Sequence, residues 1–169
     1  MKTGRLLSCG FSRITFQVHR NLLCYRSSVF RAMLDSDMRE AREGEIIIQD
    51  MDSTTVRSMI HYIYTGEMSE DWQDLDILEV ARAADMYDMP GWIEDLSPEL
   101  RSLDVTGGLL AGMIIAGSRY PQAKEFRKIV IQKIKDDKKV LQDPTFLSII
   151  RREDPLCLVN LLEEMFSYI

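Results

Sequence analysis

The chain has 169 residues and a hydrophobic fraction of 46%, which suffices for one core or for a core with a small helical extension. Its net charge is -6, from 21 Lys and Arg against 27 Asp and Glu, and an acidic chain without a clustered basic face argues against binding of nucleic-acid phosphates. The longest apolar run is shorter than the ~18 residues of a membrane span, and the N-terminus lacks a signal peptide's apolar region. We therefore expect a soluble intracellular protein of the nucleus, the cytoplasm or both.

Three short strands are predicted in the first third of the chain. Ile14, Phe16 and Val18 alternate with polar residues, which is the period of a half-buried strand. The segment from Arg5 to Cys9 predicts a strand before it. The β-branched triplet from Ile46 to Ile48 predicts a buried strand after it.

Helices are predicted between and after these strands. The apolar stretch from Asn21 to Cys24 is too short for more than one helical turn. Ser27 is a suitable N-cap for a helix over Val29 to Leu34. Ser53 is the expected N-cap of a longer helix, which Gly66 is expected to end.

The second half of the chain is almost entirely helical in its pattern. The stretch from Val105 to Ser118 contains several glycines, each of which weakens a helix by ~1 kcal/mol relative to alanine, so packing must hold it. Ser97-Pro98 is expected to end or kink the helix that Pro90 begins. The dipeptides Asp143-Pro144 and Asp154-Pro155 have the form of an N-cap followed by a first helical residue. The predicted helices run over residues 75–88, from 90 onward, and over 105–118, 121–134, 145–151 and 156–166.

Several sequence pieces occur in one order with short connections: FQVHRNLL, RSSVFRAML, DMRE, IIIQD and IHYIYTGEM. Together they resemble the BTB (POZ) domain, most closely that of the speckle-type POZ protein family. The resemblance implies an α+β, mostly helical fold. A BTB domain with a small sheet flanked by helices would cover residues 1–100, and a helical, BACK-like extension would cover residues 101–169. The resemblance is looser in the extension, and the MATH domain of speckle-type relatives is absent from this chain.

The resemblance points to Met38 and Glu40 as a docking motif. BTB proteins that recruit cullin-3 carry a hydrophobic residue, any residue and then Glu or Asp after the corresponding helix, and Met38-Arg39-Glu40 fits that pattern. A flexible methionine can fill a shallow apolar pocket on a partner. A carboxylate can fix the register by a charge-assisted hydrogen bond. The alternative is a solvated loop without a docking role.

Two further residues, Leu22 and Arg20, and the final helix correspond to interaction regions of the family. Leu22 matches a dimer contact, although it could equally be a core residue of the monomer. The apolar final helix, represented by Phe166, either packs under the preceding helices or leaves part of its surface for a second dimer contact. Arg20 matches the basic member of a charged pocket with which some POZ transcription factors bind corepressors. The usual acidic partner of that pocket would lie before the first strand.

No enzyme chemistry is predicted. His19 and His61 have no Cys, His or carboxylate at metal-ligand spacing. Cys24 near His19 has an apolar setting, which raises the pKa of a thiol, and no third orienting group is evident. Three widely spaced cysteines favour reduced thiols over a disulfide framework. We expect no cofactor and no metal.

Two functions remain open from the sequence. The first is a non-catalytic adaptor that self-associates and recruits cullin-3 into a ubiquitin ligase, with the substrate bound by a region outside this chain. The alternative is an oligomerisation module of a transcriptional or scaffold protein without ligase function. Neither function involves nucleic acid or a membrane.

Overall fold

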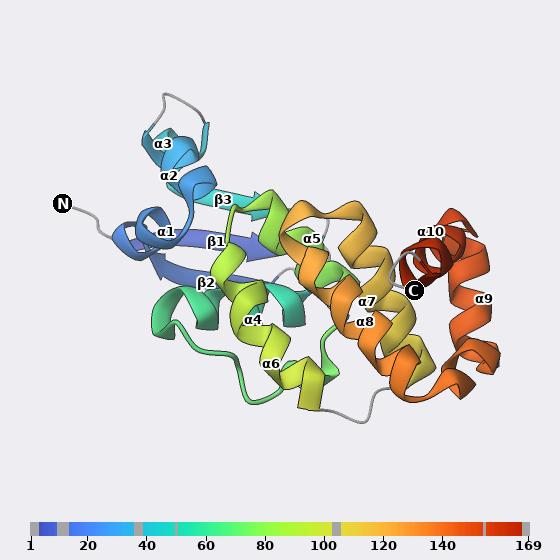
Figure 1. The fold of residues 1–169 in the computed structure, drawn as a ribbon. Coiled ribbons are helices and arrows are strands. Elements are labelled where there is room, and N and C mark those ends of the chain that lie inside the picture. The colour runs from blue at the N-terminus through green and yellow to red at the C-terminus, as the bar shows by residue number, and fades with distance from the viewer. Residues whose placement is uncertain are drawn as a thin grey trace. The chain divides into compact units, whose positions relative to one another are not determined.

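The computed structural model describes residues 4–9, 14–35, 39–49, 51–102, 106–153 and 155–166. The chain divides into two compact units, the first made of residues 1–75 with 83–92 and the second of residues 76–82 with 93–169. Two helices are divided between the units: α5 (Ile77–Met86) and α6 (Pro90–Ser102). Figure 1 shows a small sheet with helices in the first unit and a bundle of helices in the second.

The first unit contains a sheet with the strand order β2-β1-β3. The strands are β1 (Gly4–Cys9), β2 (Ile14–His19) and β3 (Glu45–Ile48). Leu7 of β1 lies opposite Phe16 in the antiparallel pair with β2 and beside Ile46 in the parallel pair with β3. Leu7, Val18 and Ile46 are buried, one on each strand. The side chains next to them along each strand face outward. The three predicted strands are confirmed, because alternating apolar residues place one face of the sheet in the core.

The short helices of the first unit begin directly after β2. They are α1 (Arg20–Arg26), α2 (Ser28–Asp35) and α3 (Arg39–Glu43). After β3 come the longer helix α4 (Ser53–Thr65) and the 3-10 turn η1 (Trp72–Asp74). α1 is longer than the single turn expected for its apolar residues, since the Ser27 N–H still donates to the Leu23 carbonyl at 3.0 Å. The Ser27 hydroxyl then accepts the Phe30 N–H at 3.1 Å, so Ser27 caps α2 as predicted.

The longest helix of the first unit, α4, starts one residue earlier than expected. Its N-cap is Asp52, whose carboxylate accepts the N–H groups of Thr54 and Thr55 at 2.7 and 2.8 Å. Ser53 is therefore the first helical residue, and its prediction as the cap is wrong. A carboxylate satisfies two free N–H groups and also interacts favourably with the helix dipole. Gly66 ends the helix with φ +75°, as predicted.

The second unit is built around α7. Its elements are α7 (Gly107–Arg119), η2 (Pro121–Ala123), α8 (Lys124–Asp136), η3 (Lys138–Gln142), α9 (Pro144–Glu153) and α10 (Pro155–Phe166). Residues 77–82 of α5 and 93–102 of α6 also belong to this unit. One side of α7 is completely buried, including Leu110 and Ile114, and the helix packs against α8 and α9. Pro98 does not end α6, because Leu96 and Leu100 on either side of it are fully buried. Packing thus outweighs the hydrogen bond that proline removes.

Candidate partner-docking site

The predicted docking motif falls at the junction of α2 and α3. Met38 lies outside the described residues, and Glu40 is in the first turn of α3 with a half-buried side chain. Arg39 forms an ion pair with Glu43 at 2.8 Å along the helix. The hydrogen bond that Arg39 donates to Glu43 is the largest cause that raises the pKa of Arg39 above its ordinary value. Gly44, with φ +75°, ends the short helix.

The Glu40 carboxylate retains its capacity to accept hydrogen bonds. Within the described part of the chain, no side chain or backbone group donates to it. By contrast, the carboxylate of Glu43 accepts a hydrogen bond from Arg39. Of these two α3 carboxylates, Glu40 is therefore the one with no hydrogen-bond donor among the described residues, which suits a contact with another molecule.

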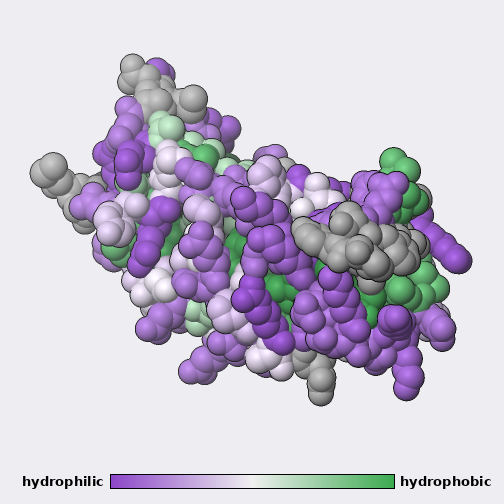
Figure 2. Space-filling view, in the orientation of Figure 1, coloured by the Kyte–Doolittle hydropathy of each residue, from purple (hydrophilic) through white to green (hydrophobic). Residues whose placement is uncertain are grey.

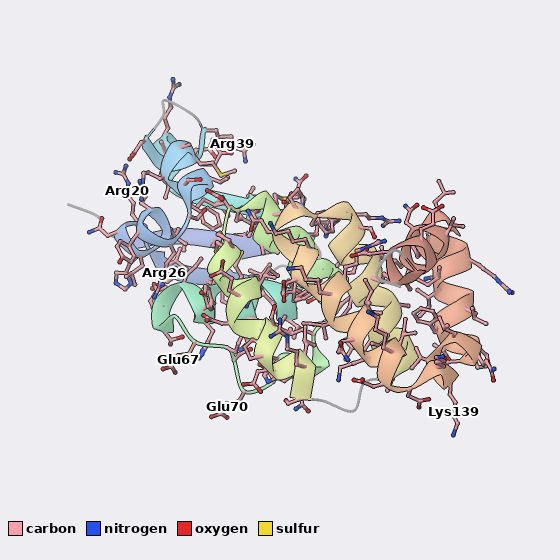
Figure 3. The ribbon with its side chains drawn as sticks, viewed as in Figure 1. Arg20, Arg26, Arg39, Glu67, Glu70 and Lys139 are labelled. Carbon is pink, nitrogen blue, oxygen red and sulfur yellow. The ribbon has the colours of Figure 1, made fainter. Side chains whose placement is uncertain are left out.

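The end of α2 is anchored by Arg20. Its Nη2 donates to the Leu34 carbonyl at 3.0 Å and forms an ion pair with Asp35. A second arginine, Arg31, donates from Nε to the Cys24 carbonyl at 2.9 Å and joins α2 to α1 again. Contacts with α1 thus hold α2 near its start, through Arg31, and at its end, through Leu34 and Asp35. Arg20 and Arg39 are both labelled in Figure 3, on α1 and α3.

The acidic partner of Arg20 was not anticipated. The family pattern places that partner before the first strand, whereas here it is Asp35, from the last turn of α2. Both side chains are substantially exposed, 37% for Arg20 and 58% for Asp35, so the pair contributes little to stability. Arg20 is thus already paired with a carboxylate of the same chain. The only sequence feature that could have indicated this ion pair is the acidic residue at the end of the predicted helix.

Leu22 lies on the half-buried side of α1. The core residue of that helix is its neighbour Leu23, which has no exposed surface. One turn after Leu22 comes Tyr25, whose side chain is 76% exposed. The Arg26 guanidinium lies 5.7 Å from the Tyr25 ring centre and 5.8 Å from that of Tyr62. Leu22 and Tyr25 thus form a small apolar surface beside a cation.

The final helix, α10, is divided between a buried and an exposed side. Leu161 is fully buried, whereas Leu156 and Val159 are 69% and 49% exposed. Phe166 is the last residue of the helix, and its helical position aligns with Leu156 and Val159 along one stripe. The helix therefore packs on one side and exposes apolar residues on the other, and its role as a dimer contact stays a prediction.

The described residues contain no group of three His, Cys, Asp or Glu side chains that could hold a metal ion. His19 is engaged in the fold, because the Tyr64 hydroxyl lies 2.8 Å from both its backbone nitrogen and its Nδ1. His61 is exposed on α4, and Cys24 is a half-buried free thiol. Among the helices in the described ranges, none combines the length and apolarity that crossing a bilayer requires.

Comparison with known proteins identifies the family. The family described as BTB/POZ domain matches residues 7–102, more than half of the chain. The chain belongs to the BTB/POZ family. The expected α+β fold class, a BTB fold with a small sheet and a mostly helical chain, is thereby confirmed. A BTB/POZ domain is a protein-interaction module, which supports a protein-interaction role for this chain.

The curated relatives are considerably longer proteins. Human Kelch repeat and BTB domain-containing protein 4 is 28% identical over 134 residues, which are 76% of this chain and 25% of that protein. Rat Kelch-like protein 38 is 38% identical over 84 residues, 50% of this chain and 14% of that protein. Mouse TD and POZ domain-containing protein 3 is 36% identical over 76 residues, 45% of this chain and 21% of that protein. This BTB chain therefore spans about a quarter or less of these relatives.

Among solved structures, the BTB domain of zebrafish PATZ1 is similar with a TM-score of 0.46 and 17% identity, covering 58% of this chain and 75% of that one.

Proposed function

We propose that this BTB chain recruits cullin-3 as the substrate-adaptor subunit of a ubiquitin ligase. The observation that carries the proposal is the Glu40 carboxylate, which sits in the first turn of α3 without a donor among the described residues. Met38, two positions earlier, would fill an apolar pocket on cullin-3, and Glu40 would accept a charge-assisted hydrogen bond. The Arg20 contacts hold the end of α2 from which this motif follows.

The adaptor would perform no bond chemistry. Its contribution is effective concentration, because linking a substrate-binding region to a ligase-binding module raises the local concentration of one partner near the other by orders of magnitude. The substrate would bind a region outside this chain, as the MATH domain does in speckle-type relatives. The same proposal includes a close relation to the speckle-type group and a place in the nucleus or cytoplasm. It also includes a BTB domain over residues 1–100 and a BACK-like extension over residues 101–169.

Substitution of the motif tests the cullin-3 contact. Met38→Ala and Glu40→Ala should each weaken binding to the purified cullin-3 N-terminal region at least about tenfold, measured by titration calorimetry, because each removes a central contact. The matched control is Arg39→Ala, which changes the intervening residue of the motif and the ion pair with Glu43. This variant should bind as tightly as the wild type.

Equal losses in all three variants would point to damage of α3 rather than to a docking motif, and unchanged binding in all three would remove the mechanism. Circular dichroism should show the same helix content throughout. If the unaltered chain forms no complex with cullin-3 at micromolar concentration but still self-associates, the alternative function applies. The chain would then be an oligomerisation module without ligase function.

We also propose that the chain self-associates, through Leu22 and through the α10 face to which Phe166 belongs. The exposed Tyr25 beside Leu22 supports the first surface, and the exposed Leu156 and Val159 support the second. Large apolar side chains that are exposed together on one helix side are typical of interaction surfaces.

A further inference from the structure

One segment of this acidic chain is strongly basic. Residues 124–139 contain seven of its 21 Lys and Arg but only three of its 27 Asp and Glu. The segment comprises α8 and the start of η3. Its formal charge is therefore about +4, and that of the rest of the chain about -10. The overall composition conceals this basic helix, contrary to the expectation of a chain without a clustered basic face.

A groove of about 380 Å³ runs along the basic helix, between α8 and the end of α6. Hydrophilic residues gather over α8 in Figure 2. The buried Ile129 provides an apolar floor. All the lining residues belong to the second unit: Arg101, Lys128, Ile129, Gln132, Lys133 and Asp136.

The cations of this groove are held in place by contacts within the second unit, and two of them, Arg101 and Lys128, are largely exposed. Glu125 forms ion pairs with both Arg101 and Lys128, the latter at 2.9 Å. The Lys128 hydrogen bond is the largest cause that lowers the pKa of Glu125. The side chains of Arg101 and Lys128 are nevertheless 57% and 66% exposed, so both remain accessible from solvent. Lys133 Nζ donates to the Arg101 carbonyl at 3.0 Å, which fixes a third cation beside them.

We propose that this groove binds an acidic peptide segment of a partner protein. Carboxylates of the peptide would pair with Arg101 and Lys128, and a neighbouring apolar side chain would rest on Ile129. Three cations and the carboxylate of Asp136 line the groove, which gives it a net positive charge. A nucleic acid fits less well, because a phosphate backbone requires a longer basic track than this groove provides. The site lies in the second unit and is independent of the cullin-3 motif in the first.

A labelled peptide tests the groove in the full chain. The probe is a fluorescein-labelled peptide that alternates glutamate with leucine, and its binding is measured by fluorescence anisotropy. Arg101→Glu combined with Lys128→Glu should weaken binding at least about tenfold, because like charges then face each other. The matched control is Lys138→Glu with Lys139→Glu, which reverses two charges of the same basic segment outside the groove. This control should retain binding within about twofold.

A gain-of-binding variant keeps the test independent of stability. Asp136→Asn removes the carboxylate that lines the groove while retaining an oxygen for Gln132, so binding should tighten by about threefold or more. Equal losses in the groove variant and its control would overturn the proposal, as would equal binding of a peptide with glutamine in place of glutamate. Tighter binding of a single-stranded oligonucleotide than of the peptide would also overturn it, in favour of a nucleic-acid site.

Discussion

Gly112 and Gly117 lie in the same helix, α7, but in opposite surroundings. A Cβ added to Gly117 would lie 2.9 Å from the Arg127 backbone nitrogen and 3.0 Å from the Ala123 carbonyl oxygen. Nothing lies within 4 Å of a Cβ added to Gly112. Gly117 therefore allows α7 to approach the backbone at the start of α8, whereas Gly112 only weakens the helix.

Alanine at these two positions should have opposite effects. Gly117→Ala is expected to lower the free energy of unfolding by about 1–3 kcal/mol, because the contacting atoms are mostly backbone and cannot move aside. Gly112→Ala is expected to raise it by up to about 1 kcal/mol through better helix propensity. Urea unfolding followed by circular dichroism measures both. Stabilisation by both variants would mean that α7 and α8 are not in such close contact.

At the level of single elements, α10 combines a buried side with an exposed apolar side. Its buried side holds Leu161, and Glu164 forms an ion pair with Arg127 of α8. Arg127 also donates to the Ser118 hydroxyl of α7 at 2.9 Å, so one guanidinium joins three helices. Leu156 and Val159 of the same helix remain exposed to solvent.

A charge on the exposed stripe of α10 should weaken self-association. We expect Val159→Lys to raise the dimer dissociation constant about tenfold, because a charge would enter an apolar contact. Asn160→Lys adds the same charge at the next exposed position and should have little effect. Sedimentation equilibrium over a concentration series measures the dissociation constant of both variants. The free energies of unfolding of the two variants, from thermal unfolding, should differ by less than about 0.5 kcal/mol. Identical masses for both variants and the wild type would exclude the α10 stripe as an interface.

For the whole molecule, the question is where the chain can be divided. The expected boundary at residue 100 falls inside the second unit, since residues 93–102 of α6 belong with α7 to α10. Arg101 is paired with Glu125 of α8, which links α6 to the later helices. Leu96 and Leu100 of α6 are fully buried.

A chain truncated after residue 100 should therefore be less stable than the full chain. Removal of α7 to α10 would expose apolar surface of α6 at a cost of about 25 cal/mol for each Å² uncovered. The expected results are a lower melting temperature and stronger binding of a hydrophobic dye than for the full chain. A fragment with the melting temperature of the full chain would instead make residues 1–100 an independently folding domain.

Local features of the sequence determined the elements and the family. The two-residue period of the strands, the Ser27 cap and the Gly66 stop are all encoded by residues close to one another along the chain. The order of the BTB pieces was also visible in the sequence, and it led to Met38 and Glu40 as a candidate motif. Glu40 is in the described structure, and Met38 is outside it.

Other features were decided only by tertiary structure. The partner of Arg20 is Asp35, fifteen positions away, and the groove depends on Arg101 meeting a helix that begins after residue 123. The continuation of α6 past Pro98 likewise follows from the burial of its neighbours rather than from its own preference. The physical reason is that periods and caps act between neighbouring residues, whereas ion pairs, grooves and burial depend on distances between segments that no local pattern encodes.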